Sequence, residues 1–181
     1  MVPSPDTPNP ASRRILLRFL LFQAFLLWQG GFLFYALVVV PIGTDLLGSA
    51  TEQGMITRHV TNWLNLFGVA WVVLFLIDLL VTADPSPRRR RVRWVGWAIS
   101  IVGLVFLAWL HPVMAGMLDQ EEGYSARSFG FLHGVYLWVS AAHWVAGLVL
   151  AWTTLRAWQA VDGLRPLPPT MDPACSLSKE S

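Results

Sequence analysis

The sequence predicts an all-α fold, namely a polytopic membrane protein with a four-transmembrane-helix bundle and both chain ends in the cytoplasm (N-in/C-in). Of the 181 residues, 55% are hydrophobic and 13% are charged, whereas a soluble domain carries about 25% charged residues. The mean hydropathy is +0.52. Apolar residues gather in four runs, each long enough to cross a hydrocarbon core of about 30 Å. Arginines cluster in alternate connections, which is the pattern that sets orientation in a bilayer.

Residues 1–14 are expected to form a disordered leader, because the first ten are rich in proline and polar residues. The first span, residues 15–40, is too long for the apolar region of a signal peptide, which has about 7–15 residues. Pro41 is expected to close this span, because proline lacks the N–H that an inner helical turn requires. The second span covers residues 60–82, and Pro85 follows it.

The third span covers residues 92–113, and Pro112 is expected to end it. The fourth span covers residues 129–158, so that residues 15–158 make one transmembrane domain. Residues 159–181 contain four prolines and scattered charges, a composition typical of a flexible tail, here expected in the cytoplasm. The single cysteine, Cys175, lies in this tail, and a disulfide within the chain would need a second one.

The short connections predict the orientation, because Lys and Arg in short loops favour the cytoplasmic side. Arginines precede the first span and crowd the connection between the second and third spans, whereas the other two connections carry few cations. The chain is therefore expected in the bacterial plasma membrane, with the lipid bilayer as a partner. Five arginines of the crowded connection are also expected to contact anionic lipid headgroups: Arg88, Arg89, Arg90, Arg91 and Arg93.

A polar stripe runs along the fourth span. At about 100° per residue, four of its side chains fall within an arc of about 80°: His133, Tyr136, Ser140 and His143. The second span offers two matching amides, Asn62 and Asn65. Such a stripe must face other helices or a water-filled cavity rather than lipid. The simplest interpretation is interhelical hydrogen bonding, since Asn and Ser commonly hold membrane bundles together.

The histidines permit a second interpretation. In the expected orientation three of them lie near the outer ends of their helices, and His143 lies about 15 Å deeper than His133. Imidazole and thioether ligands together suit copper, and the candidate copper ligands are His59, His111, His133 and Met114. Paired imidazoles also ligate haem iron, and the candidate haem ligands are His59, His111, His133 and His143. Against a shared copper site, Pro112 is expected to interrupt the helix between His111 and Met114.

Asp78 stands near the inner end of the second span, where an acidic side chain is costly unless it is paired or hydrated. The nearby arginine-rich connection can supply a counter-charge, and pairing with arginine is the simplest expectation. A proton or ion pathway from His143 toward Asp78 is the alternative. Four helices barely enclose such a path, so a transporter or channel would require an oligomer.

Three segments resemble one family of small membrane proteins: residues 29–41 (QGGFLFYALVVVP), residues 65–68 (NLFG) and residues 131–136 (FLHGVY). They are similar to the first, second and final helices of the bacterial proteins with a DUF4149 domain and their eukaryotic TMEM-type relatives. The likeness covers about residues 25–150. The chain departs from the family pattern by three additional histidines, namely His59, His111 and His143. The resemblance implies a four-helix fold in a membrane, and it implies no established activity.

Three function classes remain open. The first is a structural or accessory subunit of a membrane assembly, with a membrane-protein partner or a second copy of the chain. The alternative is a haem- or copper-binding redox or metal-handling protein, and the further alternative is a small oligomeric transporter or channel. Motifs for an enzyme are missing, such as a phosphate-binding glycine loop, HExxH or GxSxG. Basic residues do not interleave with aromatics on a soluble face, so nucleic acid is not expected as a partner.

Overall fold

The computed structural model describes residues 10–118 and 126–164. In these residues every element is helical and no strand occurs; the elements are α1 (Pro10–Phe34), η1 (Tyr35–Val39), α2 (Val40–Leu47), α3 (Ala50–Val81), α4 (Pro87–Leu118) and α5 (Ala126–Gly163). Four helical segments are long and apolar enough to cross a membrane: Ala11–Leu47, Glu52–Val81, Pro87–Met117 and Ser128–Gly163. The prediction of an all-α chain with four long apolar helices is confirmed.

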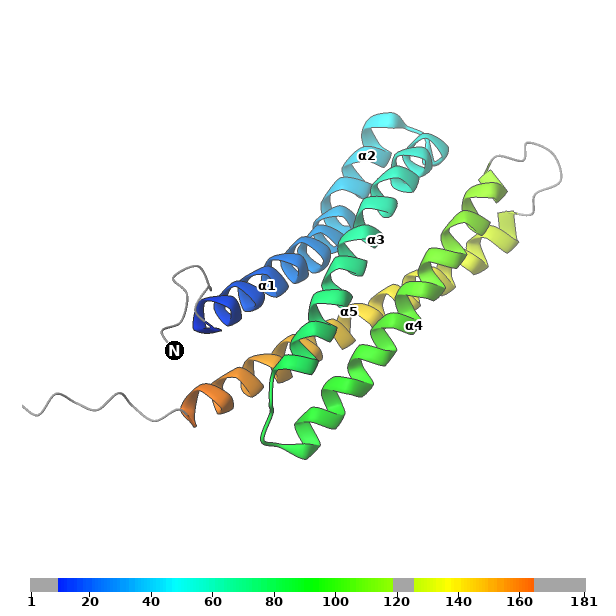
Figure 1. Cartoon of the computed structure of the whole chain (residues 1–181). Coiled ribbons are helices and arrows are strands. Elements are labelled where there is room, and N and C mark those ends of the chain that lie inside the picture. The colour runs from blue at the N-terminus through cyan, green and yellow to red at the C-terminus, as the bar shows by residue number, and fades with distance from the viewer. Residues whose placement is uncertain (1–9, 119–125, 165–181) are drawn as a thin grey trace, which may run out of the picture.

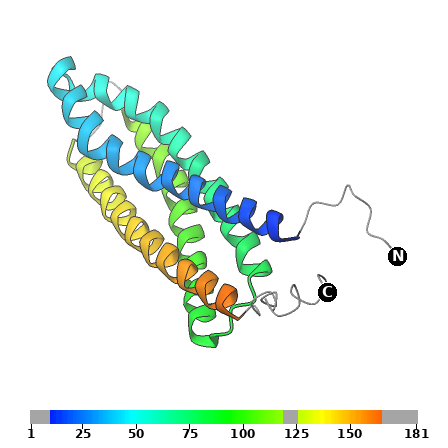
Figure 2. The same ribbon diagram turned by 90° about the vertical axis from the view of Figure 1, so that its left-hand side faces the viewer.

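The helices form two antiparallel pairs, α1 with α3 and α4 with α5, and α3 packs against α4 to join the pairs (Figures 1 and 2). The start of α1, the connection at residues 82–86 and the end of α5 lie at one end of the bundle, called here the Pro85 end. The opposite end, called the α2 end, carries α2 and the turn into α3. Side chains of α1 and α5 also meet, since the Gln29 amide donates to the Trp144 carbonyl at 2.8 Å.

Two helices extend beyond the predicted spans. The first begins at Pro10, so residues 10–14 are helical rather than part of a leader; proline suits a first helical position because its missing N–H would be unpaired there. The last helix continues to Gly163, five residues into the predicted tail. Residues 1–9 and 165–181, which hold the rest of the leader and of the tail, lie outside the described residues.

Pro41 does not close the first helix. The Val40 N–H donates to the Tyr35 carbonyl five residues earlier, and this π-helical turn leads directly into α2. In a regular α-helix the Pro41 ring would clash with the carbonyl of Leu37, and the wider turn relieves that clash. The helix ends instead at Gly48, which has a φ of 63°, a conformation that glycine adopts without steric cost.

Pro112 lies inside α4, so the prediction that it ends the third helix is wrong. The helix continues to Leu118. Proline is tolerated inside long apolar helices because neighbouring groups satisfy the freed carbonyl. As a consequence, His111 and Met114 stay on one continuous helix, about one turn apart. The expected interruption between these two side chains does not occur.

Aromatic side chains build the core near the middle of the bundle. Trp28 stacks on Trp71 with ring centroids 4.8 Å apart and an interplanar angle of 7°. Trp71 also contacts Phe25 and Phe75 at centroid distances of 5.8 and 5.9 Å. Such ring pairs add about 0.5–1.5 kcal/mol each beyond their buried area. These ring contacts therefore pack α1 against α3 in the core.

Glycine permits close helix approach at Gly96 but is not required for it at Gly130 and Gly134. At Gly96 of α4 a Cβ atom would lie 2.5 Å from the nearer methyl carbon of Leu150 on α5, so a larger residue there would force Leu150 to shift. At Gly130 and Gly134 a Cβ would meet no described atom within 4 Å. The spacing Gly130-x-x-x-Gly134 is typical of close helix approach, but in the described part of the chain there is open space for a side chain at both positions.

Candidate ligand-binding cavity

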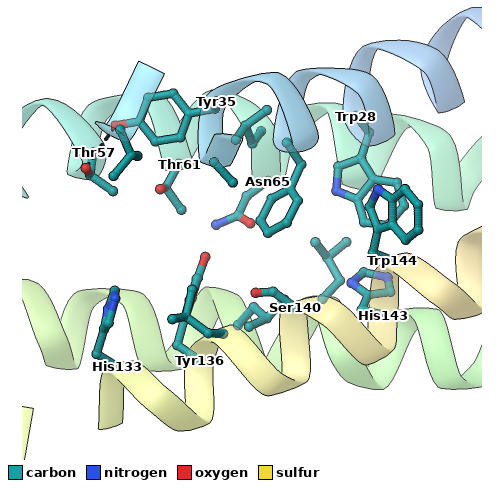
Figure 3. Close-up of a pocket in the computed structure, with 17 residues that line it drawn as sticks. Trp28, Tyr35, Thr57, Thr61, Asn65, His133, Tyr136, Ser140, His143 and Trp144 are labelled. Atoms are coloured by element: carbon teal, nitrogen blue, oxygen red, sulfur yellow. Dashed lines mark hydrogen bonds between the residues drawn. The ribbon is translucent and has the colours of Figure 1, made fainter. Parts of the chain in front are cut away.

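A cavity of about 340 Å³ lies between the α1–α3 pair and the α4–α5 pair, in the half of the bundle nearer the α2 end (Figure 3). Seventeen residues surround it. Its apolar and aromatic walls come from Trp28, Phe32, Ala36, Val40, Leu64, Leu104, Leu107, Leu137 and Trp144. Its polar side chains are Tyr35, Thr57, Thr61, Asn65, His133, Tyr136, Ser140 and His143. None of the lining residues is Asp, Glu, Lys or Arg.

The floor of the cavity rests on the aromatic core. The His143 ring lies 4.6 Å from the ring of Trp28 and 6.5 Å from that of Trp71, measured between centroids. Gly103 of α4 faces this imidazole, since a Cβ there would lie 3.3 Å from the Cγ of His143. The stacked tryptophans and the close helix backbone therefore fix the position of His143.

Two polar side chains at the floor are buried without a hydrogen-bond partner. Ser140 is 4% exposed and His143 is 3% exposed. Within the described part of the chain, neither the Oγ of Ser140 nor either ring nitrogen of His143 has a partner. Most buried polar side-chain atoms in native proteins are hydrogen-bonded, and one that is not requires an explanation. These two groups line a cavity, so a molecule in the cavity can supply the missing bonds.

The opposite wall contains polar groups that are already bonded. The Tyr35 hydroxyl donates to the Oγ1 of Thr57 at 2.9 Å and accepts from the Gln53 amide at 3.3 Å. Thr57 in turn donates to the carbonyl of Gln53 at 2.8 Å. This network holds the first residue of the π-helical turn against α3. Farther along the cavity, Tyr136 and Asn65 point toward one another from opposite walls (Figure 3).

The structure brings together most of the predicted polar stripe. His133, Tyr136, Ser140 and His143 line the cavity from α5, and Asn65 lines it from α3. Asn62 is exposed and does not line the cavity, so its assignment to the stripe is wrong.

The cavity face of α3 is set by Thr57, Thr61 and Asn65, which recur every four residues and therefore share one helix face. Asn62 lies about 100° around the helix from Thr61. That four-residue repeat is the sequence signal by which Thr57 and Thr61 could have been recognised. No comparable repeat in the sequence indicates that Tyr35 and Trp28 line the cavity.

The predicted metal ligands do not all converge. His111, Met114 and His133 line a second cavity of about 260 Å³ at the α2 end, next to the first. His59 is exposed and lies outside this cavity, and His143 belongs to the floor of the first. Arg58 lines the second cavity as well, and its positive charge opposes a cation there. In the residues described, no group of three or more His, Cys, Asp or Glu side chains could hold a metal ion.

The copper hypothesis therefore keeps three of its four residues at one cavity and loses His59. Bis-histidine haem ligation by His133 and His143 is geometrically excluded, because the two residues lie about 15 Å apart along one helix. Ligation by His111 and His133 stays a prediction, as does copper binding.

At the Pro85 end, both carboxylate oxygens of Asp78 are hydrogen-bonded. Asp78 forms an ion pair and hydrogen bond with Arg93, and both side chains are buried. Asp78 also accepts hydrogen bonds at 2.9 Å from the indole N–H of Trp158 and from the hydroxyl of Thr82. The expected pairing of Asp78 with an arginine is confirmed. Arg93 is 0% exposed, so the prediction that it contacts lipid headgroups is wrong: the carboxylate of Asp78 holds it inside the bundle.

A buried apolar cluster lies on α3 near Asp78. Trp71, Phe75 and Leu79 follow one another at successive turns of α3 and belong to one buried apolar cluster with Leu150. This cluster lies between His143, which Trp71 contacts, and Asp78. The transporter alternative stays a prediction.

The connection at residues 82–86 carries its own ion pair. Asp84 accepts from the Nε of Arg89 at 2.8 Å, from the Nη2 of Arg89 at 2.5 Å and from the Ser86 backbone N–H at 2.9 Å. Burial opposes the charge of Asp84, but these hydrogen bonds and the nearby guanidinium outweigh it, so the pKa of Asp84 is lowered. Among the remaining arginines of this region, Arg88, Arg90 and Arg91 are exposed.

No family model, no curated protein and no solved structure matches the chain. The resemblance to the DUF4149 group therefore stays a prediction. The cavity combines a volume of about 340 Å³, a lining without Asp, Glu, Lys or Arg, and two buried polar side chains on its floor.

Proposed function

We propose that this chain is a multi-pass plasma-membrane protein whose cavity binds a small, uncharged and largely apolar molecule. The observation that carries the proposal is the pair of buried, unpartnered side chains, Ser140 and His143, on the floor of the 340 Å³ cavity. Ligand sites in proteins are typically cavities of about 300–1,000 Å³ with apolar walls and a few convergent polar groups. The cavity meets each of these criteria.

Membrane placement is supported by the outer surface of the bundle as well as by helix length. Large apolar side chains such as Phe19, Leu80, Val102 and Trp138 are exposed, and in water they would carry a large hydrophobic cost. The exposed arginines Arg88, Arg90 and Arg91 lie at the Pro85 end. In the N-in/C-in orientation these three side chains lie at the inner leaflet, where they attract anionic headgroups.

The ligand enters from the bilayer rather than from water. Three residues that line the cavity are also exposed on the surface of the bundle: Ala36 of η1, and His133 and Leu137 of α5. Two of them are apolar, and none of the cavity-lining residues is Asp, Glu, Lys or Arg. A molecule dissolved in the hydrocarbon phase can therefore enter without meeting a charged lining residue.

The accessory-subunit hypothesis stays a prediction, but one argument for it has weakened. That hypothesis treats the polar stripe as interhelical hydrogen bonding, whereas Ser140 and His143 have no such partner in the described residues. The apolar surface leaves room for a protein partner or a second copy of the chain. Binding a ligand does not conflict with such an assembly.

The orientation is tested with the single native cysteine. Cys175 lies in the C-terminal tail, so a membrane-impermeant maleimide should label it only after intact cells are permeabilised. In a Cys175→Ser background, Asp45→Cys at the α2 end should be labelled in intact cells. Labelling of Cys175 from outside, without permeabilisation, would rule out the N-in/C-in arrangement.

Ligand binding is tested with a photoreactive long-chain alcohol that carries a diazirine. Peptides around Tyr136 and Ser140 should be labelled, and excess unlabelled alcohol should compete for that labelling. Ser140→Leu fills the floor with apolar atoms and should abolish the competed labelling. Ala141→Leu adds similar bulk at an exposed neighbouring position and should leave it intact. Labelling of equal intensity in wild type and Ser140→Leu would contradict the proposal.

A further inference from the structure

We infer that a small cavity at the Pro85 end binds a phosphate group, and that Arg14 is the cation that holds it. This site is separate from the proposed ligand cavity and does not rest on the proposed function. Two observations point to it: a small cavity with charged side chains in its wall, and a partly buried guanidinium that lacks a counter-charge in the described residues.

The cavity lies where three helices and a connection meet. Its volume is about 90 Å³, and its wall is built from α1, α3, the connection at residues 82–86 and α5. One water molecule occupies about 30 Å³ in the liquid, so the space suits one small polar group rather than an acyl chain. The arginine-rich start of α4 lies at the same end of the bundle (Figure 1). In a bilayer this end lies at the level of the lipid headgroups.

Arg14 lacks the partners that a partly buried cation needs. Its Nε atom is buried and has no hydrogen-bond partner, and its side chain forms no ion pair in the part of the chain that the structure describes. A guanidinium keeps its charge in proteins, and withdrawing that charge from water is costly unless an anion compensates it. A phosphate group supplies both the negative charge and the acceptor oxygens, and guanidinium groups bind it with two parallel hydrogen bonds.

The other charged side chains of the wall already have counter-charges. Arg18 donates to both carboxylate oxygens of Asp162, at 2.6 and 3.2 Å. Asp78 forms its ion pair with Arg93. Because each of these pairs is neutral as a whole, the charge that remains in the wall is that of Arg14. The cavity therefore favours an anion over a cation or a neutral group.

The wall is held together without Arg14. The guanidinium of Arg18 on α1 lies 5.0 Å from the ring centroid of Trp158 on α5. The indole of Trp158 in turn donates to Asp78 on α3. These contacts link the three helices around the cavity. A change at Arg14 should therefore remove a contact to the ligand and leave the links between the helices in place.

A phosphate group can reach this cavity from two sources, the headgroup of an anionic lipid or free phosphate. The test uses full-length, delipidated protein in dodecyl maltoside, a detergent without phosphate. The probes are dioleoylphosphatidylglycerol, dioleoylglycerol, which has the same acyl chains without the phosphate, and sodium phosphate at constant ionic strength. The rise in melting temperature with probe concentration gives the affinity for each probe.

We expect saturable stabilisation by a phosphate probe and none by dioleoylglycerol. Stabilisation by phosphatidylglycerol alone would identify the lipid headgroup as the source, and stabilisation by sodium phosphate would show that the site accepts the free anion. Either result supports the inference. Failure of both phosphate probes to stabilise the protein would overturn it, because the cavity would then hold only water.

Variants at two neighbouring arginines test the role of Arg14. Arg14→Gln removes the charge and should weaken binding of the phosphate probe about tenfold. Arg13→Gln makes the same change at an exposed neighbour outside the cavity and should weaken binding by less than about twofold. Arg14→Lys keeps the charge but loses the forked donors, so its affinity should lie between those of wild type and Arg14→Gln.

Two further results would overturn the inference. Equal weakening by Arg14→Gln and Arg13→Gln would show general attraction to the basic end of the bundle rather than a site. A lower melting temperature of Arg14→Gln than of wild type without any probe would show that Arg14 is already bonded within the fold. Neither measurement involves Ser140 or His143, so the proposed function stands or fails separately.

Discussion

The buried carboxylate of Asp78 at the Pro85 end and the buried polar side chains of the cavity floor differ in how their polar atoms are bonded. At the Pro85 end, Asp78 is bonded by Arg93, Trp158 and Thr82, and apolar side chains surround the group. Toward the α2 end, Ser140 and His143 are equally buried but border a cavity and have no partner in the described residues. The same pairs of helices build both regions.

This contrast distinguishes a polar group that is bonded within the fold from those to which the proposed function assigns a ligand. A buried charge is tolerated only when hydrogen bonds and an opposite charge compensate it, as they do for Asp78. A buried hydroxyl or imidazole without a partner lowers stability, and proteins retain such groups where a ligand completes the bonding. Burial without a partner does not by itself identify the site, because Ser100 and Thr154 are also buried and unpartnered in the described residues but do not line the cavity. Ser140 and His143 are distinguished by bordering the cavity as well.

The largest expected effect comes from breaking the Asp78–Arg93 pair. Asp78→Leu leaves the Arg93 guanidinium buried without a counter-charge, and about 3–5 kcal/mol of unfolding free energy should be lost. The double variant Asp78→Leu, Arg93→Met removes both charges and should regain most of this loss. Unfolding by SDS titration measures the effect, with exposed Arg88→Met as a control near zero. Equal losses in the single and double variants would refute this account of the pair.

Helix packing gives the next comparison between the two ends. Gly96→Ala places a Cβ 2.5 Å from a methyl carbon of fully buried Leu150, and overpacking of this kind costs about 1–3 kcal/mol. Gly130→Ala meets open space and should be neutral, or stabilising by up to about 1 kcal/mol through helix propensity. Thermal unfolding of both variants in the same detergent gives the comparison. A greater loss at Gly130 would show that this position is packed in the assembled protein.

Removing hydroxyls from the cavity should have opposite effects at bonded and unbonded positions. Tyr35→Phe breaks bonds to Thr57 and Gln53 and should destabilise the ligand-free protein by about 1 kcal/mol. Ser140→Ala removes a hydroxyl that has no partner in the described chain and should stabilise it by about 1 kcal/mol. Differential scanning calorimetry after removal of bound ligand distinguishes them. A destabilised Ser140→Ala protein would mean that this hydroxyl is already bonded without a ligand.

The smallest effect concerns the ion pair of the Pro85 connection. In the folded protein the pKa of Asp84 is lower than its ordinary value of 3.8. At a pH between the folded pKa and 3.8, the folded protein therefore binds fewer protons than the unfolded chain. The stabilisation of the folded state by the Asp84 carboxylate is complete above pH 3.8 and declines as the pH falls toward the folded pKa. The loss should not exceed about 1 kcal/mol. Wild type and Asp84→Asn should converge in melting temperature as the pH is lowered to 3, and curves that stay parallel would contradict this.

Much of the fold follows from the linear sequence, because it depends on local properties. The lengths of the apolar runs predict four long helices, and the position of Pro85 correctly marks a connection. The angular spacing on one helix brings His133, Tyr136, Ser140 and His143 to one face without any knowledge of neighbouring helices. Proline positions were less informative, because the effect of Pro41 and Pro112 depends on how the surrounding backbone adjusts.

Other features depended on which helices meet, and only the tertiary structure could decide them. Arg88 and Arg93 belong to the same arginine-rich segment of the sequence, yet in the structure only Arg93 lies inside the bundle and pairs with Asp78. The sequence likewise predicts a polar stripe but does not show whether facing groups satisfy it or leave a cavity. Side-chain periodicity is a property of one helix, whereas bonding and empty volume are properties of the space between helices. That is why the amino-acid order alone determined four apolar helices and their polar face, and the packing of α1 and α3 against α4 and α5 determined the binding cavity.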